Sequence, residues 1–203
     1  MCEVIPAVPS DERTLSLVIT EAFLDLPPAQ WLIPGQATRR ELFPDYFRIL
    51  VDHAMAAGTV DTIPERCAVA LWLPVSADGP APPAEGYAAR LAQTTGPHLD
   101  QFTAFDTTLD HHHPTGIAHE HLAILAVHPA VQGQGVGTAL LAAHHAVLDQ
   151  TGTPAYLEAS SPRNAALYLR HGYHPQPGAP FCLPSDGPPM LAMWRPAQAP
   201  RPG

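Results

Sequence analysis

The sequence predicts one domain of the mixed α/β class, in which helices cover a central sheet, and two regions carry this prediction. An apolar, strand-like run at 122–127 passes through a glycine-rich turn into an amphipathic helical pattern at 139–148. A second strand and a second helix follow between 156 and 173. The length of 203 residues, of which 46% are hydrophobic, is enough for one substantial core. We therefore expect a single domain over 1–195.

The remaining elements follow from local patterns. Cap-like residues at 10–12 begin the first helix, the proline pair at 27–28 ends it, and Gly58 ends the second. The expected helices lie at 14–24, 38–57, 87–94 and 99–109. The expected strands outside the central region lie at 4–8, 59–63, 67–73 and 190–194. A proline-rich loop at 77–85, an irregular segment at 175–189 and a disordered tail at 196–203 complete the chain.

Composition and charge limit the class of function. The net charge is −9, and all ten cationic residues are arginines scattered along the chain, which argues against nucleic-acid binding. An acidic surface raises the local concentration of cationic amines, although solubility alone would also account for it. The three cysteines are widely spaced, so they predict neither a disulfide framework nor a zinc site. With no membrane-length apolar run and no signal-peptide pattern, we expect a cytoplasmic protein without a membrane partner.

The glycine-rich turn from Gln132 to Thr138 is the strongest functional feature. It precedes a helix, so its backbone N–H groups meet the positive end of the helix dipole and favour a phosphate. A P-loop needs a lysine after its last glycine, and the chain contains no lysine. A dinucleotide-binding turn needs glycine or alanine where Thr138 stands. Glu158, about 20 residues on, stands where a dinucleotide-binding fold has its ribose-binding acid. However, only about 65 residues follow the glycines, which is too few for the second half of a dinucleotide-binding fold.

Four segments of the sequence resemble the GCN5-related N-acetyltransferases (GNAT). Residues 132–137 match the signature Q/R-x-x-G-x-G/A, 125–129 resemble the family's fourth strand, and 156–164 resemble its fifth strand and the following loop. Residues 164–173 match the last helix in the form N-x-x-x-Y-x-x-x-G-F/Y. The pieces at 157–164 and 167–173 are similar to puromycin N-acetyltransferase and its actinobacterial relatives. The resemblance implies a GNAT fold: a mixed, mostly antiparallel sheet of six or seven strands, splayed between the fourth and fifth strands and flanked by helices.

The resemblance also implies acetyl-CoA as co-substrate and assigns residues to it. The backbone of Leu125, Ala126 and Val127 would bond the pantetheine arm, with the Val127 amide facing the thioester oxygen. Asn164 would bond the same arm or a bridging water, and it would also suit the N-cap of the last helix. The glycine turn would hold the pyrophosphate. Its residues are Gln132, Gly133, Gln134, Gly135, Val136, Gly137 and Thr138.

Four side chains are candidates for the chemistry of amine acetylation. Tyr168 matches the family tyrosine near the coenzyme sulfur and would act as general acid. The general base stays open among His119, His121 and Glu158. The two histidines share one face of the fourth strand and titrate near neutrality, and Glu158 lies on the facing strand, where it would act as base or orient a partner. A backbone bulge in the fourth strand would change this assignment.

Two further groups of residues allow weaker interpretations. The run His111-His112-His113 invites a metal site, but consecutive histidines cannot all face one ion in a regular element, and no cysteine or acid has ligand spacing nearby. We therefore expect a flexible loop there and no metal. Four aromatic residues would either wall an amine-binding cleft or pack in the core. They are Phe23, Trp31, Phe102 and Phe105.

These observations lead to one favoured function and two alternatives. We expect an acetyl-CoA-dependent N-acetyltransferase that acts on a primary amine of a small molecule, such as an antibiotic or another secondary metabolite, by direct attack in a ternary complex. A protein- or peptide-acetylating member of the same family is the second hypothesis. A non-catalytic module that binds CoA or a dinucleotide is the third. The sequence leaves open whether the chain is a monomer or a homodimer.

Overall fold

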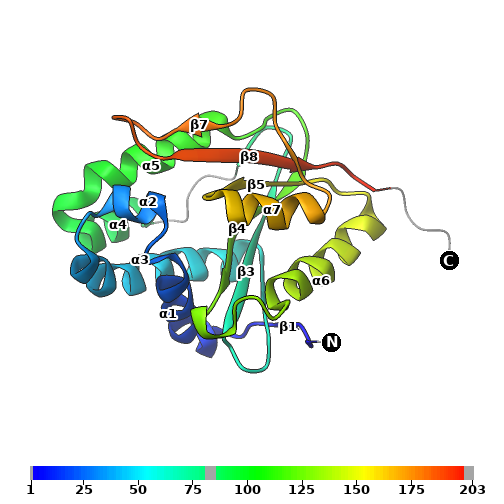
Figure 1. The fold of residues 1–203 in the computed structure, drawn as a ribbon, viewed down its shortest axis with the longest axis horizontal. Coiled ribbons are helices and arrows are strands. Elements are labelled where there is room, and N and C mark those ends of the chain that lie inside the picture. The colour runs from blue at the N-terminus through cyan, green and yellow to red at the C-terminus, as the bar shows by residue number, and fades with distance from the viewer. Residues whose placement is uncertain (1, 81–85, 199–203) are drawn as a thin grey trace.

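The computed structural model describes residues 2–80 and 86–198, and in these residues helices cover both faces of one mixed sheet (Figure 1). The strands are β1 (Ile5–Pro6), β2 (Thr59–Thr62), β3 (Ala68–Val75), β4 (His119–Val127), β5 (Ala155–Ala159), β6 (His174–Pro175), β7 (Phe181–Cys182) and β8 (Pro189–Arg195). The α-helices are α1 (Glu12–Phe23), α2 (Pro27–Leu32), α3 (Gln36–Ala57), α4 (Tyr87–Thr95), α5 (Leu99–His112), α6 (Val136–Thr151) and α7 (Pro162–Arg170). No helix in this part of the chain is long and apolar enough to cross a membrane.

The sheet is antiparallel except at its centre, where β4 and β5 run parallel. The strand order is β1-β2-β3-β4-β5-β8-β6, and β7 pairs with β8 off this path. β4 and β5 are paired only at Glu120–Ala155 and His121–Tyr156, so the two strands separate toward their C-terminal ends. The prediction of a mixed, mostly antiparallel sheet that splays between the fourth and fifth strands is confirmed. Past His121, the edge of β4 that faces β5 makes no strand pairing within the described residues.

A β-bulge interrupts β4 at Ala123. Leu71 of β3 lies opposite Ile124 and Trp72 lies opposite Leu122, so one residue of β4 has no partner. Because side chains alternate between faces along a strand, an extra residue reverses the alternation beyond it. His121 therefore shares a face with Ile124 instead of with Leu125. Leu125 and Val127, which lie beyond the bulge, point to the opposite face of the sheet from His121.

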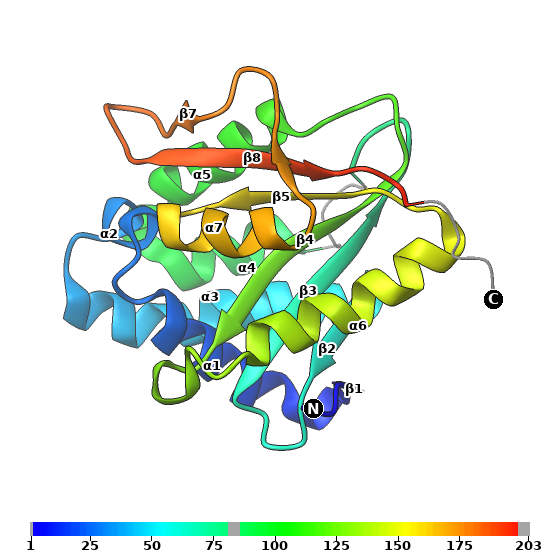
Figure 2. The same ribbon diagram turned by 45° about the vertical axis from the view of Figure 1, so that its right-hand side comes forward.

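The two faces of the sheet pack against different hydrophobic cores. Val69 and Leu71 of β3 pack against α1 to α5, whereas the alternate residues Ala68, Ala70 and Trp72 pack against α6 and α7. Figure 2 shows α6 and α7 in front of the sheet, with strands visible between them, and most of the other helices behind the sheet or at one end. The glycine turn, which leads into α6, and helix α7 thus lie on one face of the sheet, and the N-terminal helices cover the other.

Some local expectations differ from the structure. The proline pair at 27–28 ends α1 as predicted, but it also begins the unpredicted helix α2, because proline fits the first turn of a helix, where its missing N–H is not needed. The expected flexible loop at His111–His113 is wrong for its first two residues, which belong to α5. His112 stacks on Phe181 with ring centroids 3.9 Å apart, a tertiary contact that extends this helix.

The segment expected to be irregular, 175–189, contains the two-residue strand β7, and β6 ends at its first residue. Both pair with β8, which the sequence placed correctly to within one residue at each end. Residues 81–85 of the proline-rich loop and 199–203 of the predicted tail lie outside the described residues.

Candidate active site

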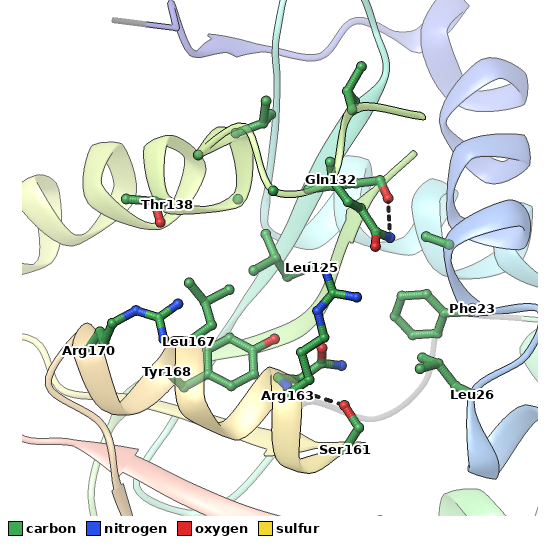
Figure 3. Close-up of a pocket in the computed structure, with 18 residues that line it drawn as sticks. Phe23, Leu26, Leu125, Gln132, Thr138, Ser161, Arg163, Leu167, Tyr168 and Arg170 are labelled. Carbon is green, nitrogen blue, oxygen red and sulfur yellow. Dashed lines mark hydrogen bonds between the residues drawn. The ribbon is translucent and has the colours of Figure 1, made fainter. Parts of the chain in front are cut away.

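A groove of about 490 Å³ opens where β4 and β5 separate. Its walls are the glycine turn, the C-terminal end of β4, one side of α7 and the end of α1, as Figure 3 shows. Leu125 and Val127 point into it from β4, whereas Ala126 is buried in the core on the opposite face. Only the backbone of Ala126 is therefore available to a ligand in this groove.

The glycine turn has the backbone geometry of an anion cradle. Gly133 and Gly135 have φ values of 80° and 83°, in the left-handed region that favours glycine. Gly135 is the N-cap of α6, so the free N–H groups of the first helical turn face the groove. The side-chain amide of Gln132 donates a hydrogen bond of 3.0 Å to the Val127 carbonyl and ties the turn to β4 (Figure 3). These features fit a pyrophosphate.

Helix α7 adds two arginines to the same groove, which the sequence analysis did not select. Arg163 and Arg170 line it, and Figure 3 shows Arg163 extending from α7 toward Gln132. Neither forms an ion pair with another described residue, and none of the residues that line the groove is acidic. The two residues are seven apart and so share a helix face, and this spacing next to the glycine turn is the signal that could have identified them.

The start of α7 is held by Ser161, not by Asn164. The Ser161 hydroxyl accepts a hydrogen bond of 3.2 Å from the Asn164 backbone N–H, so Ser161 is the N-cap and Asn164 lies in the first turn. The capping role expected for Asn164 is therefore wrong. Its side-chain amide donates to the Ser160 hydroxyl at 3.1 Å, and the residue lines the groove.

A second cavity of about 210 Å³ lies on the other side of the splayed strands. It is enclosed by α1, α2, α3, α5 and the bulged part of β4, with Glu158 at the β5 side. Five residues line both this cavity and the groove, so the two spaces meet at their side chains: Phe23, Leu26, Leu125, Asn164 and Tyr168. Of the aromatic candidates, Phe23 and Phe105 line the cavity. The others do not: Phe102 is fully buried in the core, and the Trp31 indole donates to the Pro184 carbonyl.

Tyr168 stands at the junction of the two spaces. Its ring is buried, and Figure 3 shows its hydroxyl directed into the groove toward Leu125. Burial raises the pKa of the phenol, so the hydroxyl keeps its proton throughout the neutral range. The hydroxyl is therefore present as a hydrogen-bond donor at this point, and its role as general acid stays a prediction.

His121 and Glu158 form a pair at the edge of the second cavity. The His121 Nε2 lies 3.0 Å from the Glu158 Oε2, and both residues line the cavity. Burial opposes ionisation of the Glu158 carboxyl, but the interactions with His121, His113 and Tyr156 together outweigh it and lower the pKa of Glu158. With the carboxylate ionised, the His121 Nε2–H donates to it, and the second ring nitrogen, Nδ1, is left for another partner.

His119 lies behind this pair and lines neither space. Its Nδ1–H donates to the Ile117 carbonyl at 2.8 Å, so its Nε2 accepts from the His113 Nε2–H at 3.0 Å. Burial lowers the pKa of His119, and it lowers that of His113 to about 4, so both rings are neutral near pH 7. Of the candidate bases, the structure thus places His121 and Glu158 at the cavity and His119 in the wall that supports them.

Comparison with known proteins shows the family. Residues 101–175 match the model of the acetyltransferase (GNAT) domain. A solved structure from Corynebacterium glutamicum, described as histone acetyltransferase HPA2 and related acetyltransferase, is 31% identical, with 100% of each chain covered and a TM-score of 0.70. The chain belongs to the GNAT acetyltransferase family. As a member of this family, the protein is an enzyme of the acyltransferase class, and its family uses acetyl-CoA as co-substrate.

More distant GNAT structures share the fold alone. Arylalkylamine N-acetyltransferase 2 from Aedes aegypti is 8% identical with a TM-score of 0.61, and 96% of this chain and 98% of that chain are covered. The Escherichia coli ribosomal-protein alanine N-acetyltransferase is 18% identical with a TM-score of 0.53, over 98% and 95% of the two chains. These GNAT proteins include enzymes named for small-molecule and for protein acceptors, so the fold does not determine the acceptor.

Most, but not all, of the other residues expected to bind the GNAT co-substrate line the groove. Val136, Gly137 and Thr138 line the groove with Gly133 and Gly135, whereas Gln134 is not among the lining residues. The Thr138 hydroxyl lies 3.4 Å from the His171 Nε2. The expected roles of these residues stay predictions.

One cluster of described residues has the geometry to hold a metal ion. Ligand atoms of His113, His121 and Glu158 all lie within 4.8 Å of one another. Glu158 is the acidic partner that the sequence near the histidine run lacks, and only the fold brings it there. The hydrogen bond between His121 and Glu158 already occupies one ligand atom of each, and a proton-transfer pair uses the same atoms without an ion. The expectation of no metal stays a prediction.

Proposed function

We propose that this GNAT enzyme transfers the acetyl group of acetyl-CoA to a primary amine of a small molecule by direct attack in a ternary complex. The observation that carries the proposal is the opposite charge of two adjoining spaces. The groove contains two arginines and no acid among its lining residues, and the cavity contains Asp106 and Glu158 and no arginine. Such a pair suits an anionic donor and a cationic acceptor that meet at Tyr168.

The donor side would use backbone and arginine contacts. The N-terminal turn of α6 and the glycines at 133 and 135 would hold the pyrophosphate, and Arg163 and Arg170 would neutralise the remaining phosphate charge. Gln132 stands where the family signature allows glutamine or arginine, and here its amide is bonded to Val127 and carries no charge. The two arginines of α7 supply that charge from across the groove. The unpaired edge of β4 would receive the pantetheine arm.

The transfer would need two residues that move protons. Bound acetyl-CoA supplies the acetyl group as a thioester. His121 accepts one proton from the acceptor ammonium, and Glu158 stabilises the resulting imidazolium. The amine nitrogen then bonds to the carbonyl carbon as the carbon–sulfur bond breaks, and Tyr168 donates its proton to the sulfur. Tyr168 recovers its proton from the nitrogen of the new amide, and the His121 imidazolium releases its proton to the solvent, so both residues return to their starting state.

A protein or peptide acceptor is the second candidate, because the solved relative at 31% identity is described as a histone acetyltransferase. The small, enclosed cavity favours a small molecule over a polypeptide. Similarity to the puromycin N-acetyltransferase subgroup, a role in antibiotic modification, the cytoplasmic location and the monomeric or homodimeric state remain proposals that rest on the sequence.

The proposal is tested with the purified full chain in two measurements. Calorimetry should show that acetyl-CoA binds one site, and that Arg163→Ala with Arg170→Ala weakens binding by about tenfold or more, since each arginine contributes a charge-assisted contact. Thiol release should then depend on an added amine and should produce the N-acetyl product by mass spectrometry. Absence of acetyl-CoA binding, or binding without transfer to any of a broad panel of amines and peptides, would contradict the proposed enzyme.

A further inference from the structure

The acceptor cavity has aromatic and aliphatic walls over most of its surface. Phe23 of α1, Phe47 of α3 and Phe105 of α5 face it from three helices, and Leu50, Leu109 and Met190 complete its apolar part. The phenylalanines come from elements that approach one another only in the fold, and Phe23 and Phe47 already pack edge to face with centroids 5.6 Å apart. A flat ring in this space would make the same edge-to-face contacts.

The size of the cavity limits the acceptor. A cavity of roughly 150 Å³ accommodates one benzene ring, so about 210 Å³ holds one ring with a short chain. An aminonucleoside, a polyamine with its water shell or a peptide segment exceeds this space. The aliphatic part of the wall also gives no hydrogen bonds to a chain of polar groups.

The charged groups of the cavity define where an amine would lie. Glu158 is buried, its side chain being 5% exposed, and its Oε1 has no hydrogen-bond partner among the described residues. An unpartnered buried carboxylate oxygen calls for a donor, and the ammonium of a substrate would supply it. Asp106 lines another part of the wall, where its carboxylate accepts a hydrogen bond of 2.7 Å from the Tyr87 hydroxyl. No arginine lines the cavity to compete for either acid.

We propose that the acceptor is a compact arylalkylamine, in which one aromatic ring carries a primary amine on a short alkyl chain. This inference rests on the proposed function and names its substrate class. The ring lies among Phe23, Phe47 and Phe105, and the amine lies between Glu158 and Tyr168, next to the groove. Acetylation removes the positive charge that Glu158 attracts, so the neutral amide binds less tightly and leaves the cavity.

The first experiment compares acceptors in the thiol-release assay with saturating acetyl-CoA. The panel contains 2-phenylethylamine, spermidine, puromycin and a lysine-containing peptide. We expect kcat/KM for 2-phenylethylamine to exceed the others by about 100-fold, because it places an apolar ring in the cavity and an ammonium at Glu158 without the nucleoside of puromycin or the polar chain of the other two amines. Preference for spermidine or puromycin would overturn the inference and leave the proposed function standing. Preference for the peptide would overturn the inference and would also favour the second candidate function, a protein or peptide acceptor. If no amine is acetylated, both are overturned.

The second experiment changes the volume of the cavity. Leu50→Trp should fill it, lowering kcat/KM for 2-phenylethylamine by about tenfold or more while sparing ethylamine and the affinity for acetyl-CoA. Leu17→Trp, at an exposed position of α1 outside both spaces, is the matched control and should change neither. Phe105→Ala provides a second variant that enlarges the cavity, and it should shift preference toward 2-(1-naphthyl)ethylamine. Equal loss for ethylamine and 2-phenylethylamine in Leu50→Trp, together with no shift in Phe105→Ala, would overturn the assignment of this cavity.

Discussion

Replacement of Gly135 tests whether the glycine turn binds the donor. At this position φ is 83°, and a residue with a Cβ costs roughly 1–2 kcal/mol in the left-handed region. In Gly135→Ala the free turn relaxes away from this conformation, and binding must restore it. The dissociation constant for acetyl-CoA should therefore rise by about 5- to 30-fold, since each 1.4 kcal/mol corresponds to a factor of ten.

Gly137 provides the matched control for this measurement. Its φ is not in the left-handed region, and an added Cβ would lie 3.5 Å from the nearest atom, a side-chain carbon of Val127, which is ordinary contact. Gly137→Ala should therefore change acetyl-CoA affinity by less than about threefold in calorimetry. Equal affinity in Gly135→Ala and Gly137→Ala, with both variants folded by circular dichroism, would refute the placement of the pyrophosphate on this turn.

Four further predictions address the chemistry and the buried charges. Tyr168→Phe should lower kcat by about 100-fold and leave the Kd of acetyl-CoA within about twofold, and unchanged turnover would remove Tyr168 as the acid. Glu158→Gln should lower kcat/KM by about 100-fold or more, whereas His119→Gln should change it by less than about threefold, because His119 lies outside both spaces. A larger loss in His119→Gln than in Glu158→Gln would point to His119 as the base. Burial lowers the pKa of His145 to about 3 in the folded chain, so below pH 6.5 the unfolded chain binds a proton there that the folded chain does not, and the folded state loses stability as the pH falls. The free energy of unfolding in urea should therefore fall by about 3 kcal/mol between pH 7 and pH 4 on account of this residue. His145→Gln should reduce that fall. Dialysis against EDTA should leave turnover unchanged, and activity that zinc restores would instead favour an ion at His113, His121 and Glu158.

The groove that we propose for the donor was largely predictable, because most of its residues are contiguous in the chain. A phosphate cradle uses the backbone of one turn and the start of one helix, so its glycines appear at fixed spacing in the chain. The helix that carries Tyr168 follows a short strand and was recognised in the same way. Arg163 and Arg170 were missed because their role depends on which face of α7 meets the groove, and local sequence does not specify that face.

The pair that we propose for proton transfer, His121 and Glu158, was predictable only as a set of alternatives. His119 and His121 are equivalent in the alternation of the strand, and both share a face in the structure. The structure distinguishes the two histidines, because His121 lines the cavity whereas His119 lies outside it and is hydrogen-bonded to His113. The bulge at Ala123 then turns the far end of β4, so that Leu125 and Val127 face the groove while His121 faces the cavity. No local pattern in 119–127 marks that bulge.

The sequence by itself determined the family, and it predicted the glycine turn and Tyr168 as parts of the donor site, because each depends on neighbours in the chain. The tertiary structure alone decided the acceptor side. Phe23, Phe47, Phe105 and Glu158 lie on four elements separated by up to 135 positions, and they form one small cavity only when the helices pack on the sheet. Its size, its apolar walls and its unpartnered carboxylate are properties of that packing, and residue order does not express them.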